Sequence, residues 1–302
     1  MKPPVPYFGN KRKIAAEVWR RFGHVDRYIE PFFGSGAVLL GRPDNLIQSA
    51  DVEIANDLDC LLCNAFRAIK TKPDETANYV DWPMSEADLV ARSNWLAGQR
   101  GTLKKRLLRD PDWCCPKTGG WWLWGACCWF GYGFARSTTR KAKLPEMSRP
   151  ERGIVGRSNL REILAHLSTR LSRVQLATGD WRRVLVPATL GRGGTIGIFL
   201  DPPYGNADQR TGKIYQDETD TVGAEVCRWA LDHGDDPKVR IAVCGYQGEH
   251  DFPDSWQMFA WQGHGAYGRG RGTGKAMATR KLERIWFSPG CSVGDKAWWE
   301  NA

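Results

Sequence analysis

Thr195-Ile196-Gly197-Ile198-Phe199-Leu200-Asp201-Pro202-Pro203-Tyr204 decides the fold, because an apolar run with strand character ends in an acidic residue and two prolines. Proline fixes φ, removes a backbone donor and pushes the preceding residue toward extended geometry. The run therefore predicts a buried strand that stops at a stiff elbow, where open α/β sheets bind their ligands. The Asp201 carboxylate, the Pro202 carbonyl and the Tyr204 ring together suit a flat heterocycle with an exocyclic amine. This set indicates methylation of an amino group on a base.

Strand and helix patterns alternate on both sides of this elbow. Apolar spacing predicts helices over 11–22, 60–70, 159–171 and 223–232, and strands at 28–30, within 45–55, and at 174–177, 239–244, 256–261 and 282–287. Strands separated by helices are typical of βαβ units. The predicted fold class is α/β, with a twisted, mainly parallel sheet and helices on both of its faces.

Composition narrows the class of protein. Hydrophobic residues make up 42% of the 302 residues and charged residues 25%, which is ordinary for a globular protein. No apolar run of about 18 residues and no signal peptide are present, so we expect a cytoplasmic protein without a membrane partner. In that reducing compartment the nine cysteines are expected to be free thiols. The pairs Cys114-Cys115 and Cys127-Cys128 lack the spacing of zinc ligands, so buried thiols are favoured and no metal is expected.

The middle of the chain differs from its flanks. Between Gly101 and Arg161, thirteen Lys and Arg face four Asp and Glu, an excess of nine, and five tryptophans occur among them. Positive charge mixed with aromatic residues indicates a nucleic-acid surface, although a solvated basic face beside an aromatic core is the alternative. We predict a catalytic domain of residues 1–72 and 157–302, interrupted by a target-recognition lobe at 73–156. The cluster Trp121-Trp122-Leu123-Trp124 favours a buried core over a base-stacking platform.

A glycine turn and an acidic residue indicate a nucleotide-like cofactor. Glu30-Pro31-Phe32-Phe33-Gly34-Ser35-Gly36 reads as a strand-to-helix turn that a ligand can approach closely. Asp57 follows Gly36 by 21 residues, at the end of the next predicted strand, where a carboxylate can bind a ribose diol. The turn lacks the full phosphate-binding fingerprint. A cofactor without a pyrophosphate is therefore preferred, and S-adenosylmethionine fits.

Taken in order, these motifs resemble those of the Dam-like DNA adenine N6-methyltransferases, the alpha group. The matching segments are Pro6 to Lys11, Glu30 to Gly36, Asn56 to Asp59, Gly179-Asp180, Asp201 to Tyr204 and Arg280 to Trp286. The resemblance implies a Rossmann-like methyltransferase fold that transfers a methyl group from S-adenosylmethionine to adenine in double-stranded DNA. It also implies that the base flips out of the duplex.

The resemblance carries roles to individual positions. The N-terminal motif would contact the methionine part of the cofactor, the glycine turn would lie beneath it, and Asp57 and Asp180 would bind its ribose and adenine. The cofactor set so predicted is Tyr7, Gly9, Asn10, Lys11, Glu30, Pro31, Phe32, Gly34, Ser35, Gly36, Asp57, Asp180 and Asp201. The predicted catalytic set is Asp201, Pro202, Pro203 and Tyr204. The predicted DNA-binding set is Arg136, Arg140, Lys141, Lys143, Arg269 and Arg271.

Three other functions stay open at this point. Cytosine N4 methylation uses a similar elbow, but an Asp at position 201 in place of Ser favours adenine. A DNA-binding homologue without catalysis would have no need of Asp57, Asp201, Tyr204 and the glycine turn together. RNA as a substrate also stays open, as do the recognition sequence, any association with a restriction nuclease or a phage, and the oligomeric state.

Overall fold

The computed structural model describes most of the chain. The described residues are 1–6, 11–129, 134–136, 151–191, 193–203, 222–261 and 283–291. The chain forms two compact units, one comprising Met1–Lys2, Gly9–Ala55 and Trp181–Ala302 and the other Pro3–Phe8 and Asn56–Asp180. The predicted catalytic domain and inserted lobe have other limits and stay a prediction.

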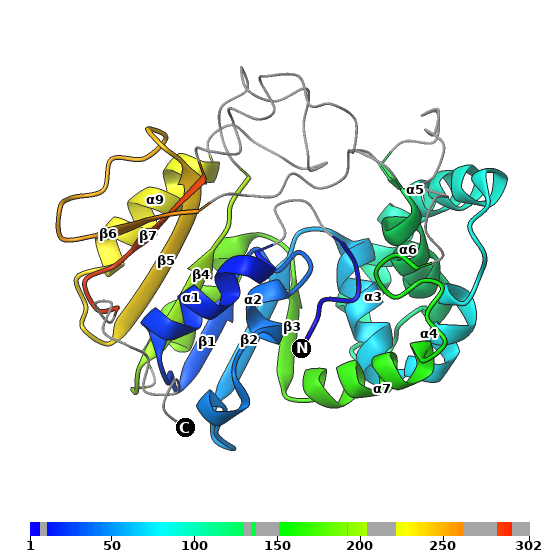
Figure 1. Cartoon of the computed structure of the whole chain (residues 1–302), viewed down its shortest axis with the longest axis horizontal. Helices are drawn as coiled ribbons and strands as arrows, with labels where there is room; N and C mark the ends of the chain where they lie inside the picture. Colours follow the sequence, from blue (N-terminus) through cyan, green and yellow to red (C-terminus); the bar gives the residue numbers. More distant parts are fainter. Residues whose placement is uncertain are drawn as a thin grey trace. The chain divides into compact units, whose positions relative to one another are not determined.

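In the described part of the chain, seven strands form one mixed sheet in the order β3-β2-β1-β4-β5-β7-β6 (Figure 1). The strands are β1 (Arg27–Glu30), β2 (Val52–Asp57), β3 (Val174–Thr178), β4 (Ile196–Leu200), β5 (Val239–Tyr246), β6 (Gln257–Ala260) and β7 (Glu283–Phe287). β1 pairs in parallel with β2 and β4, and β4 with β5, whereas β7 runs antiparallel between β5 and β6. The predicted α/β class and mainly parallel sheet are confirmed, and the arrangement is consistent with a Rossmann-like methyltransferase fold.

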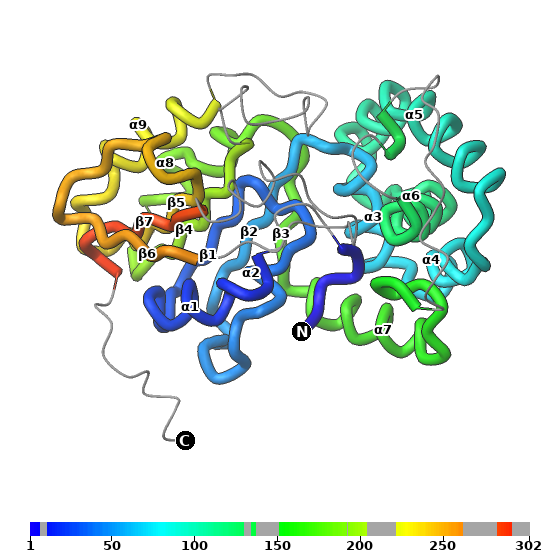
Figure 2. The backbone as a smooth tube through the Cα atoms, turned by 45° about the horizontal axis from the view of Figure 1, so that its top comes forward, coloured from blue at the N-terminus to red at the C-terminus, as the bar shows by residue number. Residues whose placement is uncertain are grey.

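In the first unit, helices cover both faces of the strands (Figure 2). They are α1 (Arg12–Phe22), α2 (Ala37–Leu40), α8 (Pro187–Leu190) and α9 (Val222–His233), with short 3-10 turns η1 (Asp44–Leu46) and η2 (Trp181–Val184). The predicted apolar face of α1 is buried, with Ile14, Val18 and Phe22 at 2% exposure or less. Trp19 lies beside them, and its ring is 4.7 Å from that of Tyr28 on β1. α1 is thus attached to the central strand by aromatic contact.

The second unit is mainly helical. It contains α3 (Cys60–Thr71), α4 (Pro73–Val80), α5 (Glu86–Arg109), α6 (Pro116–Cys128) and α7 (Leu160–Leu171). Most of α3 is buried, and α4, α5, α6 and α7 all pack against it. α6 and α4 approach closely because Gly120 has no side chain, and a Cβ atom there would stand 2.5 Å from Tyr79 Cβ. In the described part of the chain, no helix is both long enough and apolar enough to cross a membrane.

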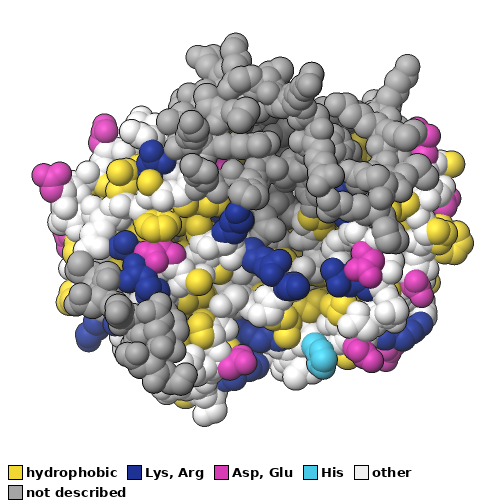
Figure 3. Space-filling view, in the orientation of Figure 1, with side chains coloured by type: hydrophobic (Ala, Val, Ile, Leu, Met, Phe, Trp, Pro, Cys, Tyr) yellow, Lys and Arg dark blue, Asp and Glu magenta, His cyan; other side chains and the backbone are white. Residues whose placement is uncertain are grey.

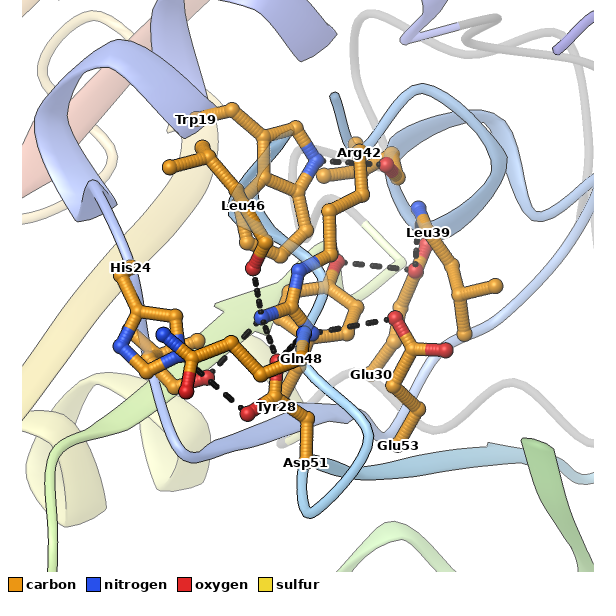
Figure 4. A network of polar contacts seen from close by, with 12 residues as sticks. Trp19, His24, Tyr28, Glu30, Leu39, Arg42, Leu46, Gln48, Asp51 and Glu53 are labelled. Atoms are coloured by element: carbon orange, nitrogen blue, oxygen red, sulfur yellow. Dashed lines mark hydrogen bonds and ion pairs between the residues drawn. The ribbon is translucent and has the colours of Figure 1, made fainter. Parts of the chain in front are cut away.

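A buried arginine connects the segments around β1 (Figure 4). The Arg42 side chain is fully buried, and its guanidinium contacts Asp51 at 2.7 Å and Glu53 at 3.2 Å. It also donates hydrogen bonds to the carbonyl oxygens of Val25 and Leu46 at 2.9 and 2.6 Å. The loop before β1, the segment after α2 and the beginning of β2 are therefore held by one cation.

Replacement of Arg42 by methionine tests this network. Arg42→Met should lower the free energy of unfolding by about 3–5 kcal/mol, because it leaves two carboxylates buried without their cation. Chemical denaturation at pH 7 measures the loss. Adding Glu53→Gln to Arg42→Met should restore part of it.

The matched control is Arg109→Met, which removes an exposed arginine from the last turn of α5. That change should shift stability by no more than about 0.5 kcal/mol. Equal effects of the two methionine variants would show that the Arg42 network does not stabilise the fold.

Candidate active site

The turn after β1 contains two glycines in the left-handed region. Gly34 has φ 51° and Gly36 has φ 68°, values that other residues adopt only at a cost. A Cβ atom on Gly36 would stand 2.5 Å from the Phe33 ring, so this position also has no space for a side chain. The predicted tight turn is confirmed, and both glycines are required by its conformation.

The buried Glu30 side chain stabilises this turn through hydrogen bonds on both sides of it. It ends β1 at 2% exposure, and its carboxylate accepts hydrogen bonds from the Tyr28 hydroxyl at 2.9 Å and the Leu39 amide at 3.1 Å. Burial raises the pKa of Glu30 well above its ordinary range, although both hydrogen bonds oppose the shift. These contacts tie the end of β1 to α2. A direct role of Glu30 toward a cofactor stays a prediction.

The elbow after β4 holds an ion pair between a buried lysine and a half-buried aspartate. Lys11 Nζ, directly before α1, lies 3.1 Å from Asp201 Oδ1, and the two side chains are 6% and 20% exposed. Burial alone would lower the pKa of Lys11, but the nearby Asp201, Cys244 and Glu283 outweigh it and raise the pKa above its ordinary value. The ammonium is therefore charged at neutral pH. Lys11 of the predicted cofactor set is therefore in direct contact with Asp201, which belongs to both the predicted cofactor set and the predicted catalytic set.

Phe32, in the glycine turn, begins a row of contacting aromatic rings. The Phe32 ring stacks on Trp181 at 6.0 Å, and Trp181 meets Trp229 of α9 edge-on at 6.5 Å. Trp181 is 5% exposed, and its indole Nε1 has no hydrogen-bond partner among the described residues. A buried donor without a partner is costly. This donor is therefore a candidate contact for a ligand.

In the second unit, the two predicted acidic cofactor residues are connected through the backbone. Asp57 ends β2, and its carbonyl accepts a hydrogen bond from the Gly179 amide at 3.0 Å. The Asn56 side chain donates to the Gly179 carbonyl at 2.9 Å. Asp180 follows directly, so the structure brings both predicted carboxylates to the adjoining ends of β2 and β3.

Arg100 connects this strand end to the lobe. Its guanidinium contacts both oxygens of Asp59, at 2.8 and 3.2 Å, and its Nε donates to the Ala135 carbonyl at 3.0 Å. Asp59 also accepts from the Leu61 amide and so caps α3. One arginine of α5 thus orients the residues that follow Asp57.

The tryptophan cluster of the lobe is core, as predicted. Trp122 and Trp124 are 4% and 0% exposed. Arg92 lies over the Trp124 ring at 4.3 Å and over Trp121 at 5.0 Å, and burial lowers the pKa of its guanidinium. Cys114, Cys127 and Cys128 are buried and Cys115 is half-buried, and all are free thiols.

On the face that Figure 3 shows, Lys and Arg side chains gather near the middle of the view.

Several predicted residues lie outside the described residues. They are Tyr7, Gly9, Asn10, Tyr204, Arg140, Lys141, Lys143, Arg269 and Arg271. The other predicted residues have a place in the structure: Pro31, Ser35 and Pro202 are buried, and Pro203 and Arg136 are half-buried. The described residues contain no group of three or more His, Cys, Asp or Glu that could hold a metal ion.

Sequence reasoning missed two residues of this region. Trp181 follows Asp180 directly, and its position after a predicted acidic cofactor residue was the available signal. Glu283 is the first residue of β7, and its negative charge helps to raise the pKa of Lys11. It belongs to the closing segment that carries the family resemblance, but neither its spacing nor its neighbours indicated a role.

Comparison with known families agrees with this geometry. Residues 7–89 match the family model of the D12 class N6 adenine-specific DNA methyltransferases. This match identifies an adenine-specific DNA methyltransferase. It is consistent with the Dam-like resemblance and takes in the glycine turn and Asp57, whereas the Asp201 elbow lies beyond the matched residues. A search of curated proteins gave no match.

Gly36 provides a test of the turn after β1. Gly36→Ala should destabilise the fold by about 1–2 kcal/mol, because alanine must adopt a left-handed conformation and its Cβ displaces the Phe33 ring. Thermal unfolding measures the loss.

Gly98→Ala is the control, because a Cβ atom there meets nothing within 4 Å in the middle of α5. Alanine in a helix interior should stabilise by up to about 1 kcal/mol. Shifts of the same sign and size in both variants would contradict the conformational role of Gly36.

Proposed function

We propose that this chain transfers a methyl group from S-adenosylmethionine to the N6 amino group of adenine in double-stranded DNA. In this proposal the target base flips into a pocket made by Asp201-Pro202-Pro203-Tyr204. The observation that carries it is the Lys11–Asp201 ion pair after β4 in a chain whose residues 7–89 match an N6 adenine-specific family. That match supports adenine N6 methylation of DNA in general.

The residues of the site fit the proposed cofactor. Gly34 and Gly36 leave the turn without side chains, and the orphan Trp181 Nε1 offers a donor. Asp57 and Asp180 supply acceptors for ribose hydroxyls and an adenine amine. S-adenosylmethionine, when bound, supplies an electrophilic methyl group on a sulfonium. Lys11 and the segment from Tyr7 would hold its methionine part.

The chain's own contribution is to position the amine. An adenine N6 lone pair is delocalised into the ring and is a poor nucleophile. The Asp201 carboxylate and the Pro202 carbonyl can accept hydrogen bonds from both N6 hydrogens, which draws the nitrogen toward tetrahedral geometry. Tyr204 would stack on the base and hold it in line. Such positioning and charge complementarity supply most of the catalysis without a covalent enzyme intermediate.

The alternatives have weaker support. Cytosine N4 methylation would use a similar elbow, but the family match is to N6 adenine enzymes. A homologue without catalysis would not need a buried cation to hold Asp201 in place. The proposed location of this activity is the cytoplasm of a bacterial or phage-infected cell.

The basic segment at 73–156 is proposed as the DNA-recognition lobe. Its described helices α4, α5 and α6 pack around a tryptophan core, and Lys104, Lys105 and Arg109 of α5 are exposed. Arg136, Arg140, Lys141 and Lys143 are the proposed contacts, together with Arg269 and Arg271 from the segment between the predicted strands at 256–261 and 282–287. Phosphate contacts position a protein on DNA, and base contacts specify its site.

Asp201→Ala tests the proposed catalytic role. The variant should lose methyl transfer to adenine in DNA by a factor on the order of a hundred or more, because it removes an acceptor used in the transition state. A readout of N6-methyladenine in DNA from expressing cells measures the activity and reveals its sequence context. Near-normal turnover of Asp201→Ala would contradict the assignment of the active site.

Asp57→Ala is the matched control, since it also removes one carboxylate. It should weaken S-adenosylmethionine binding about tenfold by calorimetry, whereas Asp201→Ala should leave that affinity largely intact. If both variants bound the cofactor equally well, the ribose role of Asp57 would be wrong.

The DNA-recognition lobe is tested by salt dependence. Each phosphate contact contributes about −0.9 to the log–log slope of affinity against salt. Replacing Arg140, Lys141 and Lys143 with alanine should therefore flatten the slope by up to about 3 units. An equal charge change at the exposed Lys2, Arg228 and Lys238 should leave it unchanged. A parental slope in the first variant would mean that these residues form only a solvated face.

A further inference from the structure

The ends of β4 and β5 present their side chains on one face of the sheet. Leu200 is level with Val243 in the parallel β4–β5 pair, so Asp201, one residue later, is level with Cys244. Side chains alternate between the faces along each strand, and level residues of neighbouring strands share a face. Asp201 and Cys244 therefore point to the same side at the same edge of the sheet.

The antiparallel strand β7 brings a second carboxylate to this edge. Cys244 is level with Ile285, and Tyr246 is level with Glu283. Because Cys244 and Tyr246 are two residues apart, Glu283 shares the face of Cys244 and hence of Asp201. As the first residue of β7, Glu283 lies at the edge where the parallel strands end.

Helix α1 covers this same face. A Cβ atom on Gly197, which shares the face of Asp201, would stand 3.0 Å from the Phe22 ring of α1. Lys11, directly before α1, is thereby placed over the edge, 3.1 Å from Asp201 and 5.4 Å from the centre of the Trp261 ring. Trp261 in turn donates its backbone amide to the Glu283 carbonyl at 3.4 Å.

Glu283 has an acceptor that the described residues leave unused. Its Oε2 atom is buried and has no hydrogen-bond partner among them. Burial raises the pKa of Glu283, Lys11 opposes that shift and Asp201 adds to it. The charges of two carboxylates thus stabilise the buried Lys11 ammonium, and that of Asp201 contacts it directly.

We propose that Glu283 is a positioning residue that shares Lys11 with Asp201. When Asp201 accepts hydrogen bonds from the target amine, Lys11 turns to Glu283 and keeps a carboxylate partner. Without Glu283 the buried ammonium would hold Asp201, because an unpaired buried charge is strongly unfavourable. The role of Glu283 during methyl transfer rests on the proposed function, because it requires a target amine. The sharing of Lys11 between two carboxylates can be tested in the protein alone.

A double-mutant cycle on thermal stability tests the sharing without DNA or cofactor. Glu283→Gln alone should change the melting temperature little, because Asp201 still pairs with Lys11. In the Asp201→Asn background the same change should cost about 5 °C or more, since Lys11 then loses the charge of both Asp201 and Glu283. Equal shifts in the two backgrounds would overturn the proposal.

Adding Lys11→Met to the double variant separates a lost partner from general misfolding. With the ammonium removed, stability should return to near that of Asp201→Asn. This arm also decides the case in which the double variant fails to fold. No recovery on removal of Lys11 would overturn the proposal.

Steady-state kinetics test the positioning role. Glu283→Gln should lower kcat about tenfold with KM for DNA and affinity for S-adenosylmethionine within about twofold, because Asp201 is held back only at the reacting step. Glu283→Asp should retain most of the activity, and Glu162→Gln, at an exposed position of α7, should retain all of it. Equal losses in Glu283→Asp and Glu283→Gln, or a loss confined to KM, would contradict the role.

Failure of the two proposals can be told apart. Full turnover in Asp201→Ala would remove the proposed function, whatever the stability cycle shows. An additive stability cycle beside an inactive Asp201→Ala would remove only the role of Glu283.

Discussion

Parallel pairing on both sides of β1 is the constraint on which the first unit depends. β1 lies between β2 and β4, with Ile29 level with Ile54 on one side and with Ile198 on the other. Parallel strands end at a common edge, so the glycine turn after β1 and the Asp201 elbow after β4 must meet there. A slip of one residue would turn Asp201 to the opposite face, away from Lys11.

Buried charges enforce this register. Arg42 and Lys11 are both almost inaccessible, at 3% and 5% exposure. A buried cation is tolerated only next to carboxylates that pair with it. Arg42 holds the segments at the beginning of β1 and β2, whereas Lys11 holds the elbow after β4. A different compact fold that separated either cation from its partners would leave an unpaired charge in the interior. The energetic cost of that charge would exceed the cost of imperfect apolar packing.

Local sequence predicted the elements whose cause is local. Two prolines stop β4, the apolar spacing of α1 matches its buried face, and glycines at 34 and 36 adopt the left-handed values that only a turn requires. The Arg42 network could not be predicted, because nothing in its sequence surroundings distinguishes a buried arginine from an exposed one. Likewise the contact between Lys11 and Asp201 depends on a sheet register that joins residues 190 positions apart.

Glu283 shows why sequence reasoning finds one half of such a site more easily than the other. In a parallel sheet, functional residues follow their strands, so an acidic residue after an apolar run, like Asp201, attracts attention. β7 runs in the opposite direction, and the edge that receives the ends of β1, β4 and β5 receives its beginning. An acidic residue before an apolar run is usually the solvent-exposed start of a strand, but Glu283 lies here at the same edge of the sheet as Asp201. Inserting one antiparallel strand thus supplies a second carboxylate to the buried lysine without lengthening any parallel strand.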